Sequence, residues 1–198
     1  SVNYIPKFMM PAMIHNYVTP GEHFLKTVQH HLNSRPTFRR ALQFDAYIDG
    51  WSFYAQRHLK EGGYFYSDPY QELGRLYQEL LRASAAMIDY NIHKERYERE
   101  DAITILIEVT GLPKMEAEAI IDRIIVDPGR AFAYWAGYKK IIALRNKAKT
   151  QLKERFNLKE FHQAVLNCGP VPLAVLEMAV DQYIESIIPK EKQAPVVD

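Results

Sequence analysis

Apolar residues recur at every third or fourth position along most of the chain, which is the spacing of a helix with one buried face. The first such series follows a turn at Pro20-Gly21 and consists of Phe24, Leu25, Val28 and Leu32. No stretch of useful length alternates between apolar and polar residues, as a half-buried strand would. The pattern therefore predicts an all-α fold.

Turn and capping residues divide this pattern into separate helices. Gly62-Gly63 ends one helix, and Asp68-Pro69 starts the next with an N-cap followed by proline at the first helical position. After the helix that follows Pro20-Gly21, the predicted helices cover residues 36–59, 69–93, 98–109, 113–124, 127–156, 158–167 and 172–187. We expect a single helical domain over residues 1–188 and a loose tail over 189–198.

Composition narrows the class of protein. The 198 residues are 47% apolar and 25% charged, and the net charge is +1, so no strong field favours nucleic acid or anionic lipid. The single Cys168 excludes an internal disulfide and favours a reducing compartment. Neither a signal peptide nor a membrane-spanning run is apparent, so we expect a soluble chain. A first residue other than Met suggests a processed chain or a fragment.

The stretch HNYVTPGEHF at residues 15–24 contains the side chains of a metal site. Catalytic zinc requires at least three His, Cys or carboxylate ligands and a base that activates its water. His15, Glu22, His23 and the later Asp49 are suitable ligand types. His15 and His23 are eight residues apart with Pro-Gly between them, so they cannot share a helix face as the pair in H-E-x-x-H does. Solvated or capping histidines are the simpler interpretation of the stretch alone.

Six further stretches occur together and in order along the chain. They are DGWSFYAQRHL (49–59), DPYQELGRLYQELLRA (68–83), DYNIH (89–93), DPGRAFAYWAG (127–137), LRNKAK (144–149) and FNLKEFHQAVLNCGPVPLAVLE (156–177). The series resembles the C-terminal part of the domain-of-unknown-function 885 family, from about residue 11 to 188. Members of that family look like helical zinc metallopeptidases of the thimet-oligopeptidase and carboxypeptidase Taq type. They are longer, so the resemblance implies a chain that lacks the other wall of the cleft.

This sequence departs from the family pattern H-E-x-x-P-G-H-H at the positions of the zinc ligands and the catalytic base. Aligned on the Pro-Gly pair, the first ligand becomes Asn16, the catalytic Glu becomes Tyr17, and the two later His positions become Glu22 and His23. The next acid of the family corresponds to Asp49. An amide binds zinc poorly and a phenol does not replace the carboxylate base, so the resemblance implies a site that has lost its water-activating parts.

Two other cleft motifs are altered in the same way. In R-L-V-V-D-T-G-x-H, Asp89 and His93 persist, either as a site pair or as a local helical contact four residues apart. In R-Y-x-x-x-P-G-Q-A-x-A-Y-K-x-G, the scaffold residues persist and polar residues change. The resemblance thus places these residues in the former cleft: Asn16, Tyr17, Glu22, His23, Asp49, Asp89, His93, Ile124, Arg130, Tyr134 and Trp135. His162 is interpreted separately, as a packing or capping histidine.

Two hypotheses about function follow. The first is a non-catalytic, metallopeptidase-like protein that needs no cofactor and holds an apolar small molecule in the former cleft, or fills that cleft with its own side chains. The second is an active zinc peptidase with His15, His23 and Asp49 as ligands. In either case we expect an oligomer, or a complex with a chain that supplies the missing N-terminal part, because uncovered helix faces would expose a large apolar patch.

Overall fold

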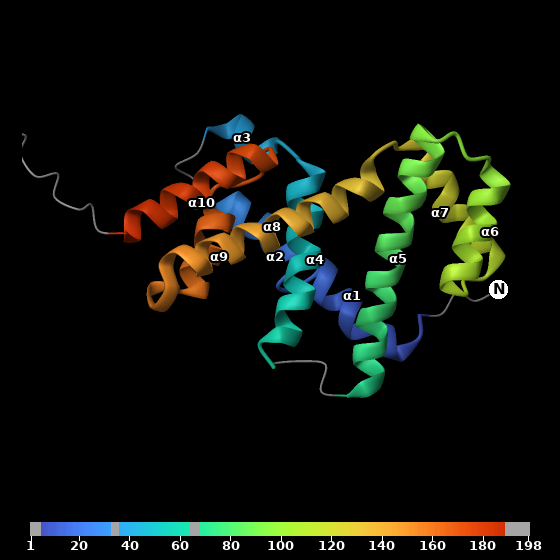
Figure 1. Cartoon of the computed structure of the whole chain (residues 1–198), viewed down its shortest axis with the longest axis horizontal. Helices are drawn as coiled ribbons and strands as arrows, with labels where there is room; N and C mark the ends of the chain where they lie inside the picture. Colours follow the sequence, from blue (N-terminus) through green and yellow to red (C-terminus); the bar gives the residue numbers. More distant parts are fainter. Residues whose placement is uncertain (1–4, 33–35, 64–67, 189–198) are drawn as a thin grey trace, which may run out of the picture.

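The computed structural model describes residues 5–32, 36–63 and 68–188, and every regular element in them is a helix (Figure 1). The predicted all-α class is therefore confirmed. Two short 3-10 helices, η1 (Lys7–Met9) and η2 (Lys153–Arg155), accompany the α-helices. The α-helices are α1 (Met10–Tyr17), α2 (Glu22–His31), α3 (Thr37–Ala41), α4 (Asp45–Glu61), α5 (Pro69–Lys94), α6 (Arg99–Thr110), α7 (Lys114–Val126), α8 (Arg130–Leu152), α9 (Leu158–Asn167) and α10 (Leu173–Ile187).

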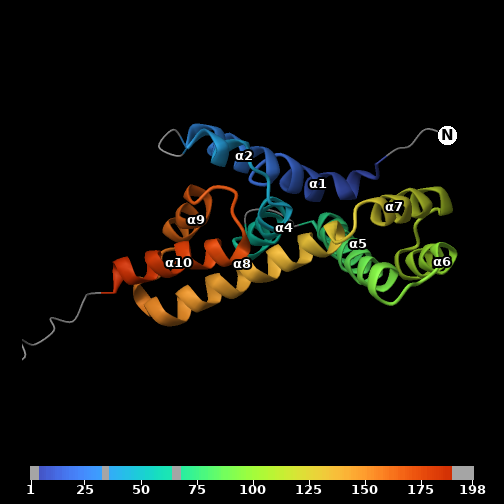
Figure 2. The ribbon, with the colours of Figure 1, turned by 90° about the horizontal axis from the view of Figure 1, so that it is seen from above.

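The crossing of α4 and α8 organises the molecule. Figure 2 shows α1 and α2 on one side of α4, with α8 and α10 on the other. At the crossing two glycines face each other, and a Cβ built on Gly137 would lie only 1.6 Å from the carbonyl oxygen of Ala46. Because no side chain separates the backbones there, the two helices approach closely enough to bury Tyr47, Trp51 and Tyr54 almost completely.

Two apolar clusters stabilise the fold. The larger one joins α4, α8, α9 and α10, and its fully buried side chains include Tyr47, Phe161, Leu176 and Ile184. The smaller one joins α5, α6 and α7 around Leu106. In Figure 1, α6 and α7 lie at the opposite end of α8 from α9 and α10. Helix α8 connects the two clusters, because its Ala131 packs on the smaller one and its residues from Tyr134 onward belong to the larger.

Most predicted helix ends agree with the structure, and two do not. The Asp68 side chain accepts a hydrogen bond from the Tyr70 N–H at 3.0 Å, which confirms the predicted N-cap of α5. The prediction of one helix over 36–59 was wrong, because extended backbone at Leu42 separates α3 from α4. The helix predicted to reach residue 156 ends at Leu152, where Lys153 adopts a φ of 50°. The tail 189–198 lies outside the described residues.

Candidate functional site

The Pro20-Gly21 turn is fixed against α4. The indole N–H of Trp51 donates a hydrogen bond to the Pro20 carbonyl oxygen at 2.9 Å. A Cβ on Gly21 would lie 1.8 Å from the carbonyl oxygen of Asn16, so only glycine lets the chain fold back on the end of α1. The turn therefore holds the last residues of α1 at a set position beside α4.

Side chains of the opening stretch point in two directions. His15 and Asn16 are buried, with 7% and 4% of their surface exposed, and burial lowers the pKa of His15. Tyr17 and His23 are exposed. Glu22 pairs with Lys26 on the same helix, with 2.6 Å between Oε1 and Nζ. The two histidines thus lie in different environments.

Arg82, on α5, joins α1 to α8 at this position. Its Nη2 donates a hydrogen bond to the Tyr17 hydroxyl at 2.8 Å, and its guanidinium lies 4.0 Å from the centre of the Tyr134 ring. A cation over an aromatic face is attracted by the ring's quadrupole. Sequence reasoning missed Arg82, because an arginine in a long amphipathic helix looks like any solvated cation.

Asp49 lies beside this group with 3% of its surface exposed. Its Oδ2 is 3.6 Å from Nη2 of Arg130, and Nη1 of Arg130 is 3.6 Å from Asp45. We call Tyr17, Glu22, Asp49, Arg82, Arg130 and Tyr134 the Asp49 site. All six come from α1, α2, α4, α5 and α8, and all but Arg82 were predicted from the sequence.

The charges of the site act on the Asp49 carboxyl in opposite directions. The pKa of Asp49 is raised to about 6, mainly by burial, and the charges of Asp45 and Glu22 contribute to the rise. Arg130 and Arg82 act against that rise. Burial is the largest cause, so the two arginines compensate only in part for the loss of water around the carboxylate.

Two buried oxygens of this region have no hydrogen-bond donor among the described residues. They are Oδ2 of Asp49 and Oδ1 of Asn16. A buried acceptor without a donor costs roughly 1–3 kcal/mol, so such atoms are rare in folded proteins. Both oxygens could accept hydrogen bonds from a bound molecule.

Asp89 connects α5 to the start of α8. Its Oδ1 accepts from the Gly129 N–H at 2.9 Å, and its Oδ2 accepts from the Phe132 N–H at 3.1 Å. His93 Nδ1 lies 2.9 Å from Asp89 Oδ1. Asp89 thus satisfies free N–H groups of α8 from another helix, which is a structural role. A hollow of about 240 Å³ beside it is lined by Asp89, Tyr90, His93, Lys94, Gly129 and Phe132.

The two remaining predicted cleft residues belong to the apolar clusters. Ile124, with 5% of its surface exposed, is part of the α5–α6–α7 cluster. Trp135 packs on the larger cluster, where its ring centre lies 5.5 Å from that of Tyr138 and 6.2 Å from that of Phe53. The structure therefore gathers part of the predicted set at the Asp49 site and places Ile124 and Trp135 in packing positions.

Comparison with known families gives one match, which covers residues 1–180. The matching family is described as "Bacterial protein of unknown function (DUF885)". The chain belongs to this family. No curated protein matches it.

The solved structures that resemble this DUF885 chain include two putative lipoproteins. The first is described as the putative lipoprotein from Colwellia psychrerythraea, with 36% identity, a TM-score of 0.89, and coverage of 91% of this chain and 31% of that one. The second is a putative lipoprotein of unknown function from Shewanella oneidensis, with 23% identity, a TM-score of 0.80, and coverage of 87% and 31%. The chain thus spans about a third of the length of these relatives. In the described part of the DUF885 chain, no helix is both long and apolar enough to cross a membrane.

The zinc ligands of the alternative hypothesis do not form a site. Across residues 5–32, 36–63 and 68–188, no three His, Cys, Asp or Glu side chains gather closely enough to hold a metal ion. His15 is buried and His23 is exposed, although only eight residues separate them. The donor set His15, His23 and Asp49 therefore does not fit zinc.

A second polar cluster of the DUF885 chain lies between α4 and α9. The Tyr54 hydroxyl is hydrogen-bonded to His162 Nε2 at 2.7 Å, and the His58 ring lies edge-on to the His162 ring with 4.8 Å between centres. Arg145 pairs with Glu61 at 2.7 Å beside them. The packing role predicted for His162 agrees with these contacts. Burial, followed by the charges of His58 and Arg145, lowers the pKa of His162 to about 4.

This low pKa predicts a loss of stability in acid. The unfolded chain binds the His162 proton near pH 6.5, while the folded chain resists it until about pH 4. Stability is therefore fully present above pH 6.5 and falls by about 3 kcal/mol as the pH drops toward 4. Urea unfolding at several pH values measures this slope. His162→Gln should flatten it relative to the native chain, whereas His30→Gln, at an exposed histidine, should not. An unchanged slope in His162→Gln would refute the assignment.

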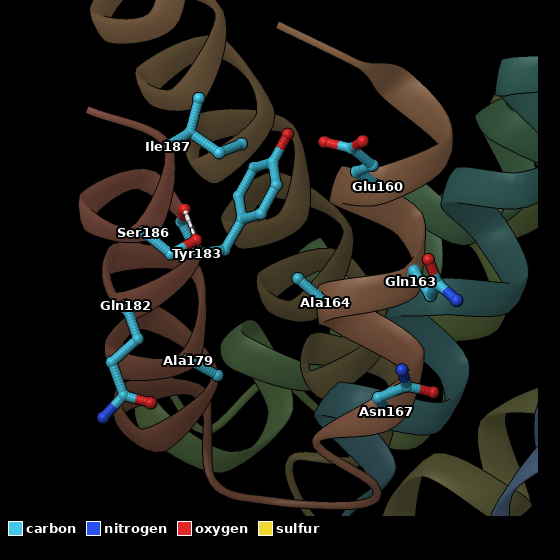
Figure 3. A pocket seen from close by; sticks show the side chains of 9 residues that line it. All are labelled: Glu160, Gln163, Ala164, Asn167, Ala179, Gln182, Tyr183, Ser186 and Ile187. Carbon is cyan, nitrogen blue, oxygen red and sulfur yellow. Dashed lines mark hydrogen bonds between the residues drawn. The ribbon is translucent and has the colours of Figure 1, made fainter. Parts of the chain in front are cut away.

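An open hollow lies between α9 and α10 (Figure 3). Its volume is about 550 Å³, and Ala164 and Ala179 lie on facing helices within it. The Tyr183 hydroxyl donates to the Asn157 carbonyl oxygen at 3.2 Å. None of the predicted cleft residues lines this hollow, so it is separate from the Asp49 site.

Proposed function

We propose that this chain is a non-catalytic, metallopeptidase-like protein that binds a small molecule at the Asp49 site. The observation that supports this role is the buried Asp49 carboxylate, whose Oδ2 has no hydrogen-bond donor among the described residues. A strongly shifted carboxyl beside a cation is more common at functional sites than in structural cores. Neither Tyr17 nor Asn16, at the positions of the base and first ligand, activates water.

The ligand's chemistry follows from the side chains of the site. Tyr17 is half exposed, so its ring offers apolar surface to a flat or aliphatic body, whereas the Tyr134 ring is buried beneath the Arg82 guanidinium. Asp49 Oδ2 of the site and Oδ1 of Asn16, which precedes Tyr17 on α1, both lack a hydrogen-bond donor among the described residues. We therefore expect a mostly apolar molecule with at least one N–H or O–H group.

The active zinc peptidase is the competing hypothesis. Its ligand set does not gather in the structure, and the position of the general base is an aromatic ring. A zinc peptidase would contain one zinc per chain, and His23→Ala would abolish both the zinc content and peptide hydrolysis. These two readouts separate the hypotheses directly.

Native mass spectrometry of the isolated protein tests the binding role. We expect an organic adduct of defined mass on the native chain and its loss in Asp49→Asn. Asp45→Asn is the matched control, since Asp45 lies one turn earlier, faces the same Arg130 and is partly exposed. An adduct that survives in Asp49→Asn, or a native chain with none, would contradict the proposal. A stoichiometric zinc adduct would favour the peptidase.

A further inference from the structure

One face of α5 carries large apolar side chains that nothing in the described chain covers. Leu73, Leu76, Leu80, Met87 and Tyr90 have 53%, 47%, 41%, 47% and 49% of their surface exposed. Ala83, between them, is half-buried. We call these six residues the α5 stripe. Scattered exposed leucines are ordinary on a protein surface, but a continuous series along one helix marks an interface.

The spacing within the stripe is alternately three and four residues throughout. A sustained 3.5-residue repeat is the seam along which two helices pack as a coiled coil. From Leu73 to Tyr90 the stripe extends roughly 25 Å along the helix. It thus offers nearly the whole length of α5 for a second helix.

The other faces of α5 are already occupied. Gly74 faces η1, where a Cβ would lie 2.1 Å from the Phe8 carbonyl oxygen. Asp89 faces the start of α8, and Ile88 faces the α5–α6–α7 cluster. At 100° per residue, every member of the stripe lies at least about 100° around the helix from Gly74. The stripe is therefore the face of α5 directed away from η1, and a partner must approach there.

We propose that the α5 stripe packs antiparallel against the stripe of a second copy of this chain. The side chains are complementary in that orientation. Leu80 of each copy meets Ala83 of the other at the centre, so the small residue lets the helices approach. Leu76 then meets Met87, and Leu73 meets Tyr90. A parallel pair would instead place Ala83 on Ala83 and Tyr90 on Tyr90, leaving a gap and a bulge.

Charges at the ends of α5 favour the same orientation. Asp68 lies at its N-terminal end and Lys94 at its C-terminal end, while Glu72 and His93 already pair with Arg75 and Asp89 within the chain. Antiparallel pairing brings the acidic end of one helix beside the basic end of the other and also opposes the helix dipoles. Parallel pairing would bring like charges together. The dimer is independent of ligand binding at the Asp49 site.

Sedimentation equilibrium of the purified chain over roughly 1–200 µM tests the dimer. We expect a monomer–dimer equilibrium, with at least a tenfold higher dissociation constant in Leu80→Glu. Met178→Glu is the control, because Met178 is an equally accessible apolar residue (61% exposed) on α10, away from α5 in both views (Figures 1 and 2). Far-ultraviolet circular dichroism confirms that both variants are folded.

Variants that each carry one added cysteine, in a chain with Cys168→Ser, test the orientation. Antiparallel pairing places residue 76 of one copy against residue 87 of the other, within reach of a disulfide. A mixture of Leu76→Cys and Met87→Cys should therefore give mainly the mixed disulfide under mild oxidation, with little homodisulfide from either variant alone. A homodisulfide of Leu76→Cys would overturn the antiparallel arrangement. A native chain that stays monomeric at 200 µM, or a dimer unaffected by Leu80→Glu, would overturn the proposal and leave the stripe to a different chain.

Discussion

Gly137→Ala should destabilise the fold by about 3 kcal/mol or more, although alanine is the better helix former by about 1 kcal/mol. The reason is the crossing of α4 and α8. The added methyl group would lie 1.6 Å from the Ala46 carbonyl oxygen and 3.0 Å from Gly50 Cα. Backbone atoms cannot rotate away as a flexible side chain does, so the two helices must separate along the largest core cluster.

Urea unfolding followed by circular dichroism measures this effect. Gly63→Ala provides the control, because Gly63 has a φ of 70° and an added methyl group there would meet no atom within 4 Å among the described residues. That variant should lose only roughly 1 kcal/mol of stability, which is the cost of holding alanine in the left-handed conformation. Equal losses in the two variants would mean that the α4–α8 contact is not closely packed, contrary to the structure.

The sequence predicted helices well where local residues decide them. Asp68-Pro69 starts α5, and the helix predicted over 158–167 matches Leu158–Asn167, because an N-cap acts within a few residues of its own position. The break at Leu42 was missed, since neither proline nor glycine marks it. Helix ends that depend on packing against other elements leave no local signature in the sequence.

The site residues show the same difference between what the sequence pattern indicates and what only packing between helices decides. Tyr17, Asp49, Arg130 and Tyr134, which the resemblance assigned to the former cleft, lie near one another in the structure. The resemblance did not indicate that Asp89 caps α8, a contact between residues forty positions apart. Arg82 escaped notice for a related reason. Its interaction with Tyr17 and Tyr134 exists only once α1, α5 and α8 have packed.

Asp49→Asn should stabilise the chain at pH 8 by about 2–3 kcal/mol. The pKa of Asp49 is raised to about 6 in the folded protein, against 3.8 without burial. For an acid with a raised pKa, folding favours the protonated form, so stability falls as the pH rises from 3.8 through 6. Above pH 6 the buried carboxylate carries its full desolvation cost. Asparagine keeps the shape of the side chain and removes the charge.

The gain should therefore depend on pH. At pH 4 Asp49 is protonated in the folded chain, so the difference between Asp49→Asn and the native protein should shrink to below about 1 kcal/mol. Asp45→Asn, which removes a half-exposed carboxylate near the same Arg130, should change stability by less than about 0.5 kcal/mol at either pH. Urea unfolding at pH 4 and pH 8 gives all of these values.

Destabilisation by Asp49→Asn at pH 8 would contradict this account and would show that the Asp49–Arg130 pair stabilises the fold. The distance argues against that result, since 3.6 Å between Oδ2 and Nη2 is too long for a hydrogen bond of normal strength. The Asp49 carboxylate lowers stability, and its Oδ2 has no hydrogen-bond donor among the described residues. The fold therefore gains nothing from this charge. Groups of this kind are typical of binding sites, where activity and stability oppose each other. The stability of Asp49→Asn therefore bears directly on the proposed function.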